Sequence, residues 1–175
     1  MILGKLRLKL WIRRLKRKGK ILFFPRATGI KRQLEDIKTV CICMPDDHKY
    51  FYEARSCVQE IKRNNIQITL VLNRELELLA EHRGRTEIYP LSLQRPFPVP
   101  EEKVNHIPAE FDLALDLSPQ PSPLSAYITG TRGKKLTAGL KSPDLDAFYT
   151  VIINRAESYR ESIITMFSAS GLLEE

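Results

Sequence analysis

The chain has 175 residues, of which 43% are hydrophobic, and it carries 28 basic and 21 acidic residues. This length and this apolar content predict one domain with a buried core and one appendage. No apolar stretch approaches the roughly 20 residues of a membrane-spanning helix, and the start does not resemble a signal peptide, so we expect a cytoplasmic protein.

The positive charge is concentrated at the amino terminus. Twelve Lys or Arg residues and no carboxylate precede Glu35, which leaves 16 basic and 21 acidic residues for the rest of the chain. We therefore predict a basic arm over residues 1–34 and a domain over residues 35–175. Such an arm is expected to bind an anionic membrane surface or another acidic partner. The basic residues that would make this contact are Lys5, Arg7, Lys9, Arg13, Arg14, Lys16, Arg17, Lys18 and Lys20.

The first 20 residues favour a helix. Leu8, Trp11, Ile12 and Leu15 fall within one sector of a helical wheel, with Lys and Arg around the rest, as in a helix that lies at a membrane interface. Residues 5–10 alternate like a strand, but Leu, Lys and Arg are good helix formers and β-branched residues are scarce. We expect a basic amphipathic helix, peripheral at the inner face of the membrane.

Beyond the arm, short apolar runs alternate with helical patterns. Strands are predicted at 38–44, 66–72, 86–91, 111–117, 135–140 and 148–153, and helices at 48–64, 75–82, from Ser122 onward and at 156–169. Pro90 places its strand at a sheet edge, and the prolines of residues 94–110 predict a long loop. The alternation predicts an α/β fold: a single Rossmann-like three-layer domain with a mostly parallel sheet of about six strands.

Residue types that bind metals or phosphates are present without the required spacing. The three cysteines are an odd number, Cys41 and Cys43 share one face of a strand, and the histidines lack ligand spacing, so we expect buried thiols, no metal and no cofactor. Residues 130–135 are rich in Gly and cations, as phosphate loops are. They precede a strand and do not open a helix, so we predict a turn there, after a brief helix.

Candidate site residues follow two of the predicted strands. In parallel sheets, ligands bind at the carboxyl ends of the strands. The residues at these positions are Asp46, Asp47, His48, Asp116, Ser118 and Gln120. Two interpretations stay open for the carboxylates: Asp46 and Asp47 are ligand contacts or helix caps, and Asp116 is a ligand contact or a strand-end group bonded to backbone amides.

Residues 111–140 resemble the amino-terminal, acceptor-side half of heptosyltransferase-type glycosyltransferases of the GT-B fold. In that family a Tyr-Asp-Leu-Val-Ile-Asp-Leu strand precedes a helix, a small-residue turn and a strand that closes on Ile-Gly. Phe111-Asp112-Leu113, Asp116-Leu117 and Thr137-Ala138-Gly139 match these elements, and Ser170-Gly171-Leu172 matches the end of the family's first domain. The resemblance covers about residues 38–173.

The chain departs from this family at two points. The family's catalytic base is the Asp of a Ser-x-x-Gly-Asp loop after the first strand, whereas this chain has the shorter Met44-Pro45-Asp46-Asp47-His48 without Gly. By this resemblance Asp46 and Asp47 are the catalytic candidates. The family's second domain, which binds the nucleotide-sugar donor, has no counterpart among these residues, and transfer depends on holding donor and acceptor together.

In length and order of elements the chain is still more similar to a small family of stand-alone proteins from the Bacteroidetes. This resemblance implies the same single-domain fold and no known activity. The matching segments are Lys16-Arg17-Lys18, Val40-Cys41-Ile42, residues 111–118 and residues 123–128. Together the resemblances lead us to expect a glycosyltransferase-like domain, not catalytic alone and recruited to an anionic membrane. The alternatives are an envelope sugar transferase that works with a separate donor-binding half, and a nucleic-acid-binding protein that uses its basic arm.

Overall fold

A single sheet of six parallel strands forms the centre of the molecule. The computed structural model describes residues 2–21, 37–61, 65–80, 86–91, 99 and 101–173, without the side chains of residues 2, 3 and 103. The strands are β1 (Thr39–Cys43), β2 (Gln67–Asn73), β3 (Thr86–Leu91), β4 (Phe111–Asp116), β5 (Gly133–Leu140) and β6 (Val151–Ile153). They lie in the order β3-β2-β1-β4-β5-β6, and every neighbouring pair is parallel. The predicted Rossmann-like fold is confirmed, with Pro90 on the edge strand β3.

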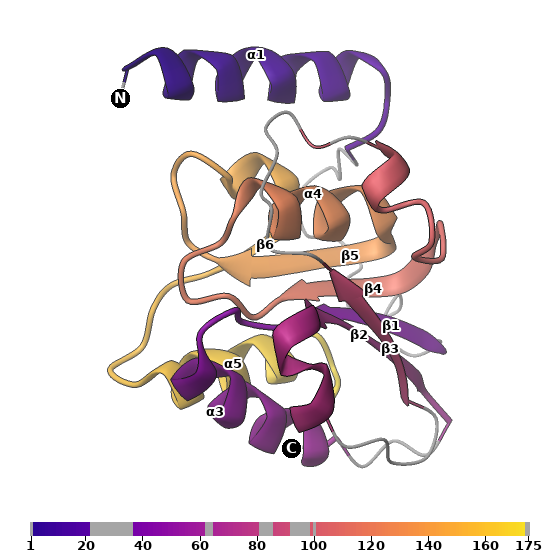
Figure 1. Cartoon of the computed structure of the whole chain (residues 1–175). Helices are drawn as coiled ribbons and strands as arrows, with labels where there is room; N and C mark the ends of the chain where they lie inside the picture. Colours follow the sequence, from indigo (N-terminus) through magenta and orange to yellow (C-terminus); the bar gives the residue numbers. More distant parts are fainter. Residues whose placement is uncertain are drawn as a thin grey trace.

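Helices cover both faces of the sheet (Figure 1). Helices α3 (His48–Gln59) and α5 (Tyr159–Ala169) pack on one face, and α4 (Pro123–Arg132) packs on the other. Three short 3-10 helices complete the described elements: η1 (Arg74–Leu79), η2 (Glu101–Lys103) and η3 (Asp146–Phe148). Since both faces are covered, the central strands are mostly apolar, with Asp112 and Asp116 of β4 as the charged exceptions, and Cys41 and Cys43 are buried as predicted.

The structure differs from the prediction around α4 and β6. The helix runs on through Gly130 to Arg132 and β5 begins at Gly133, so the turn predicted for residues 130–135 is absent. A Cβ on Gly130 would lie 2.7 Å from a ring carbon of Phe148, which shows that this glycine serves close packing and does not end the helix. The strand predicted at 148–153 is shorter, because residues 146–148 form η3. The helix predicted at 48–64 is shorter, because α3 ends at Gln59 with Glu60 as its C-cap. Residues 62–64 and most of 92–100, where a loop was predicted, lie outside the described residues.

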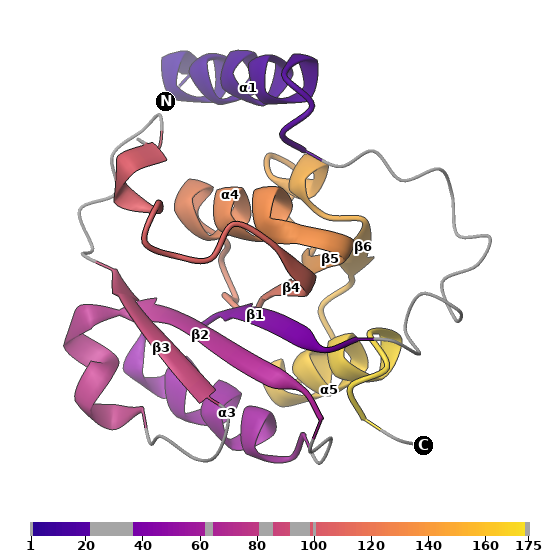
Figure 2. The same ribbon diagram turned by 90° about the vertical axis from the view of Figure 1, so that its right-hand side faces the viewer.

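The amino-terminal helix is confirmed, but its apolar sector faces the domain. Helix α1 (Ile2–Arg17) lies over α4 as an additional outer layer (Figures 1 and 2). The ring of Trp11 stacks on Tyr127 at 5.5 Å between centroids and contacts Phe148 at 5.7 Å. Ile12 and Leu15 are 8% and 5% exposed. Burial of aliphatic side chains contributes about 1.5 to 3 kcal/mol each, so the sector expected at a membrane interface instead anchors α1 to α4.

The end of α1 is closed by a glycine. Gly19 has a φ of 65°, and the amides of Gly19 and Lys20 donate to Lys16 O and Leu15 O, which satisfies the last carbonyls of the helix. At its other end, Lys5 forms an ion pair of 3.3 Å with Asp144. Among the described helices, none combines the length and the apolar character that a membrane crossing requires. The predicted boundary between arm and domain, at residues 34 and 35, lies outside the described residues.

Candidate functional site

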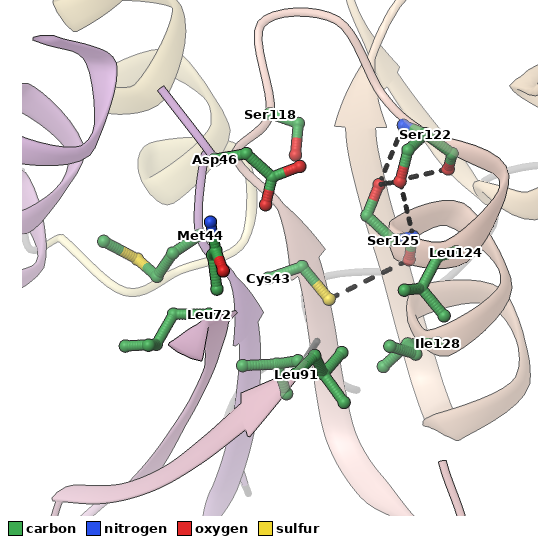
Figure 3. Close-up of a pocket in the computed structure, with 12 residues that line it drawn as sticks. Cys43, Met44, Asp46, Leu72, Leu91, Ser118, Ser122, Leu124, Ser125 and Ile128 are labelled. Atoms are coloured by element: carbon green, nitrogen blue, oxygen red, sulfur yellow. Dashed lines mark hydrogen bonds between the residues drawn. The ribbon is translucent and has the colours of Figure 1, made fainter. Parts of the chain in front are cut away.

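A small pocket lies at the carboxyl ends of β1 to β4 (Figure 3). Strand β1 is bordered by β2 on one side and by β4 on the other, so the strand order reverses its direction of growth between β1 and β4. Ligands of open parallel sheets bind at such a point. The pocket, called the switch-point pocket below, has a volume of about 40 Å³. Its lining residues are Cys43, Met44, Asp46, Val71, Leu72, Asn73, Leu91, Ser118, Ser122, Leu124, Ser125 and Ile128.

The two adjacent aspartates after β1 have different environments. The carboxylate of Asp47 accepts hydrogen bonds from the backbone amides of Lys49 at 2.9 Å and Tyr50 at 3.4 Å, so Asp47 is the N-cap of α3. Asp46 instead lines the pocket, and Figure 3 shows its carboxylate turned toward Ser118. Because capping occupies the carboxylate of Asp47, Asp46 is the better placed of the two to contact a ligand.

Asp116 lies buried beneath the pocket. It is the register partner of Cys43 on β1, its side chain is fully buried, and it accepts hydrogen bonds from Ser118 N at 3.0 Å and from Tyr149 Oη at 2.8 Å. Burial raises the pKa of Asp116, and the hydrogen bonds from Ser118 and Tyr149 oppose this only in part. Asp116 therefore matches the predicted strand-end carboxylate, and it orients Ser118 in the pocket wall.

The start of α4 forms the opposite wall. Ser122 and Ser125 make a capping box: Ser125 N donates to Ser122 Oγ at 3.1 Å, and Ser122 N donates to Ser125 Oγ at 3.0 Å. Pro123 supplies no amide hydrogen. These bonds occupy amides that would otherwise bind an anion at a helix start. Since no Lys or Arg is among the lining residues, the pocket suits hydroxyl groups better than phosphates.

Besides Asp47 and Asp116, two further sequence candidates lie outside the pocket lining, and other lining residues were missed. His48 and Gln120 are exposed and do not line the pocket. Ser122 and Ser125 were missed as site residues, although the Ser-Pro helix start after the fourth strand could have indicated them. Asn73 is 5% exposed and its side chain accepts from Glu75 N at 3.3 Å. Asn73 could have been predicted as a site residue, because it stands at the carboxyl end of the second strand.

The outer face of α1 is strongly basic. Most of its predicted contact residues are exposed, whereas Lys16 and Lys20 are half-buried. Two leucines on the same face, Leu6 and Leu10, are 55% and 54% exposed. The exposed basic residues are Lys5, Arg7, Lys9, Arg13, Arg14, Arg17 and Lys18. Cations that flank exposed leucines are typical of helices that lie on anionic bilayers.

The pocket offers hydrogen-bonding groups and little enclosed space. A volume of about 40 Å³ holds a few water molecules at most, so the pocket can accept one end of a ligand. In the part of the chain that the structure describes, no group of three metal-ligating side chains comes together.

Comparison of the chain with family models, with curated proteins and with solved structures finds no match.

Proposed function

We propose that the chain is a glycosyltransferase-like domain that binds a hydroxyl-rich ligand, such as a sugar, without completing transfer on its own. The observation that carries this proposal is that the Asp46 carboxylate and the Ser118 hydroxyl line one pocket at the strand-order reversal and point toward each other (Figure 3). A carboxylate accepts hydrogen bonds from two sugar hydroxyls, and serine hydroxyls both donate and accept. The resemblance to the acceptor-side half of the heptosyltransferases supports the same ligand class.

The size of the pocket supports an incomplete site. The pocket has room for a few water molecules only, so most of a bound sugar would extend beyond it. Transfer between two sugars needs a second surface that holds the donor and excludes water. A separate protein that supplies this surface is part of the proposal, and it makes the domain an accessory or acceptor-binding component.

We further propose that α1 holds the domain against an anionic membrane surface. Near an anionic leaflet each basic residue adds about 1 kcal/mol, and α1 presents six exposed Lys or Arg side chains, with Lys18 directly after it as a seventh. Because Trp11 and its neighbours are packed on α4, the contact would use the outer face with Leu6 and Leu10. The domain would then bind as one rigid unit with α1 docked.

Flotation with vesicles of phosphatidylglycerol tests the membrane contact. The double variant Leu6→Ser/Leu10→Ser should reduce recovery with vesicles several-fold and leave the melting temperature nearly unchanged. The matched control is Leu78→Ser, because Leu78 is 97% exposed and lies on η1, away from α1. Equal recovery of the wild type and the double variant would contradict the proposed orientation.

An envelope sugar transferase that works with a separate donor-binding half is the second candidate. It is favoured by the position of Asp46, which could take a proton from an acceptor hydroxyl bound in the pocket. In a reconstituted pair, Asp46→Asn would abolish turnover, whereas Asp47→Asn would retain both activity and stability, because Asn caps a helix as well as Asp does. The reverse result would assign the base to Asp47.

Nucleic-acid binding through the arm has less support. Single-stranded nucleic acids bind on exposed aromatic rings between cations, but the ring of Trp11 is stacked on Tyr127. A direct competition between phosphatidylglycerol vesicles and RNA for the full-length protein distinguishes the two anionic partners. The membrane proposal predicts that vesicles displace RNA.

A further inference from the structure

A second cavity lies at the opposite edge of the sheet, where β4 and β5 begin. Its volume is about 430 Å³, about ten times that of the switch-point pocket. The cavity, called the basal cavity below, is open to solvent and is bordered by the end of α1, the segment 101–110, the end of α4 and the start of β5. Its lining residues are Gly19, Lys20, Glu101, Asn105, Ala109, Glu110, Tyr127, Thr131, Arg132, Gly133 and Lys134.

The charged residues of the basal cavity are paired except for one. Lys20 forms an ion pair with Glu101, and Lys134 forms one with Glu110. Of the ion pairs between described residues, none involves Arg132. These five side chains therefore carry a net charge of one positive unit. The unpaired cation belongs to the last turn of α4, where it faces the cavity.

The guanidinium of Arg132 has a donor without a partner. One terminal nitrogen, Nη2, donates to Val104 O at 3.1 Å, and this bond ties the segment 101–107 to α4. The Nε–H group is buried and has no hydrogen-bond partner. Because Nε is shielded from the cavity, a ligand there would bind the terminal nitrogens of the guanidinium, of which Nη2 already donates one hydrogen bond to Val104 O.

The chemistry of a fitting ligand follows from these groups. Arginine binds carboxylate and phosphate oxygens through its planar row of N–H donors, and a net charge of one positive unit matches a single negative charge. The carbonyls at the end of α4 weaken the positive potential there, whereas Lys18, close enough to act on Glu101, strengthens it. Tyr127, which stacks on Trp11, forms the apolar wall.

We propose that the basal cavity binds a phosphate group, with Arg132 as its anchor and Lys20 and Lys134 at its rim. The proposal is independent of the switch-point pocket, and it gives a role to the cationic segment 130–135. Free phosphate and the phosphate of a lipid headgroup share this chemistry. A headgroup is compatible with the position of the cavity beside the basic end of α1.

The resonance of the Arg132 Nε–H group gives a direct test. In nitrogen–proton correlation spectra of the full chain, this signal should shift in a saturable manner when inorganic phosphate is added at constant ionic strength. Arg132→Gln should weaken phosphate binding at least about tenfold, since a charged hydrogen bond contributes roughly 1.5 to 3 kcal/mol. The matched control is Lys141→Gln, which removes one exposed cation after β5 and should leave the affinity unchanged.

The source of the phosphate is distinguished by a second ligand. Soluble dihexanoyl-phosphatidylglycerol that binds more tightly than inorganic phosphate would identify a lipid headgroup, and weaker binding would identify a free phosphate. Lys134→Gln keeps the test valid if Arg132→Gln does not fold, because Lys134 is exposed and its loss should still weaken binding several-fold. An Arg132 signal that neither compound shifts would overturn the proposal, whatever ligand the switch-point pocket binds.

Discussion

The hydroxyl of Tyr149 donates a hydrogen bond of 2.8 Å to the buried carboxylate of Asp116. This bond joins the segment before β6 to the end of β4, directly beneath the switch-point pocket. Burial raises the pKa of Tyr149 well above its usual value, and the neighbouring carboxylate of Asp116 adds to the effect. Tyr149 therefore remains a protonated donor, and it holds the carboxylate that in turn accepts the hydrogen bond of Ser118 N beside the pocket.

Gly139 provides the space for this pair. A Cβ at this position would lie 2.5 Å from Cζ of the Tyr149 ring, so Gly139→Ala should displace the ring. Overpacking of this kind costs about 1 to 3 kcal/mol, measurable by urea unfolding. The matched control is Gly4→Ala, since a Cβ on Gly4 meets nothing within 4 Å. Similar stabilities for both variants would contradict the packing account.

Two aspartates of β4 should give opposite pH dependences. Burial favours a higher pKa for Asp112, but hydrogen bonds from the amides of Lys38 and Thr39 and the ion pair with Lys135 outweigh burial and lower it. Asp112 thus stabilises the fold above the ordinary aspartate pKa of about 3.9, and this stability is lost as the pH falls. Asp116 has a raised pKa, so it stabilises the fold most below the ordinary aspartate pKa, and this stability is lost as the pH rises.

Urea unfolding of Asp112→Asn and Asp116→Asn from acid to neutral pH checks this difference. The free-energy gap between the wild type and Asp112→Asn should widen as the pH rises. The gap between the wild type and Asp116→Asn should narrow over the same range and beyond it. Parallel pH curves for the two variants would show that the environments of these carboxylates are not as described.

The neighbouring residues Asp46 and Asp47 should differ in their effect on stability. Asp47→Ala removes the N-cap of α3 and should lower the free energy of unfolding by about 1 kcal/mol. Asp46→Ala removes a pocket side chain and should cost less than half as much. Thermal unfolding of both variants decides the assignment, and a larger loss for Asp46 would show that Asp46 is the structural residue of the two.

Helix α1 should contribute to the stability of the whole domain. Leu15 is 5% exposed, so Leu15→Ala should cost about 2 kcal/mol or more. Trp11 is the one tryptophan of the chain, and its fluorescence reports the docking of α1. In Leu15→Ala the emission should shift toward longer wavelengths before the domain unfolds. A single coincident transition with unchanged stability would indicate that α1 is not docked.

The sequence was sufficient to predict the sheet and the helical arm, because their signals are local. The alternation of apolar and polar residues, the helix caps and the effect of Pro90 each depend on residues close together in the chain. The direction in which α1 turns its apolar face was not predictable, because the same sector of Leu8, Trp11, Ile12 and Leu15 fits a bilayer or α4 equally well. The role of Gly130 was also hidden, since it depends on contact with Phe148, 18 residues away in the chain.

The candidate site was predicted only in part for a similar reason. The rule that ligands bind at strand ends identified Asp46 and Ser118, which the fold brings to one pocket. The sequence does not distinguish Asp46 from Asp47 as the ligand contact, because only the geometry of α3 shows that the carboxylate of Asp47 accepts the capping hydrogen bonds. The contribution of Ser122 and Ser125 depends on the placement of α4 beside β1.

Saturation-transfer NMR with a methyl heptoside and a methyl glucoside tests the central claim, that the pocket of Asp46 and Ser118 binds a sugar. The wild type should transfer saturation to the ring protons of at least one of these sugars. Asp46→Asn should abolish this transfer, whereas Glu102→Gln, which changes an exposed charge outside the pocket lining, should retain it. Equal transfer by the wild type and Asp46→Asn, or no transfer to either sugar, would contradict the account.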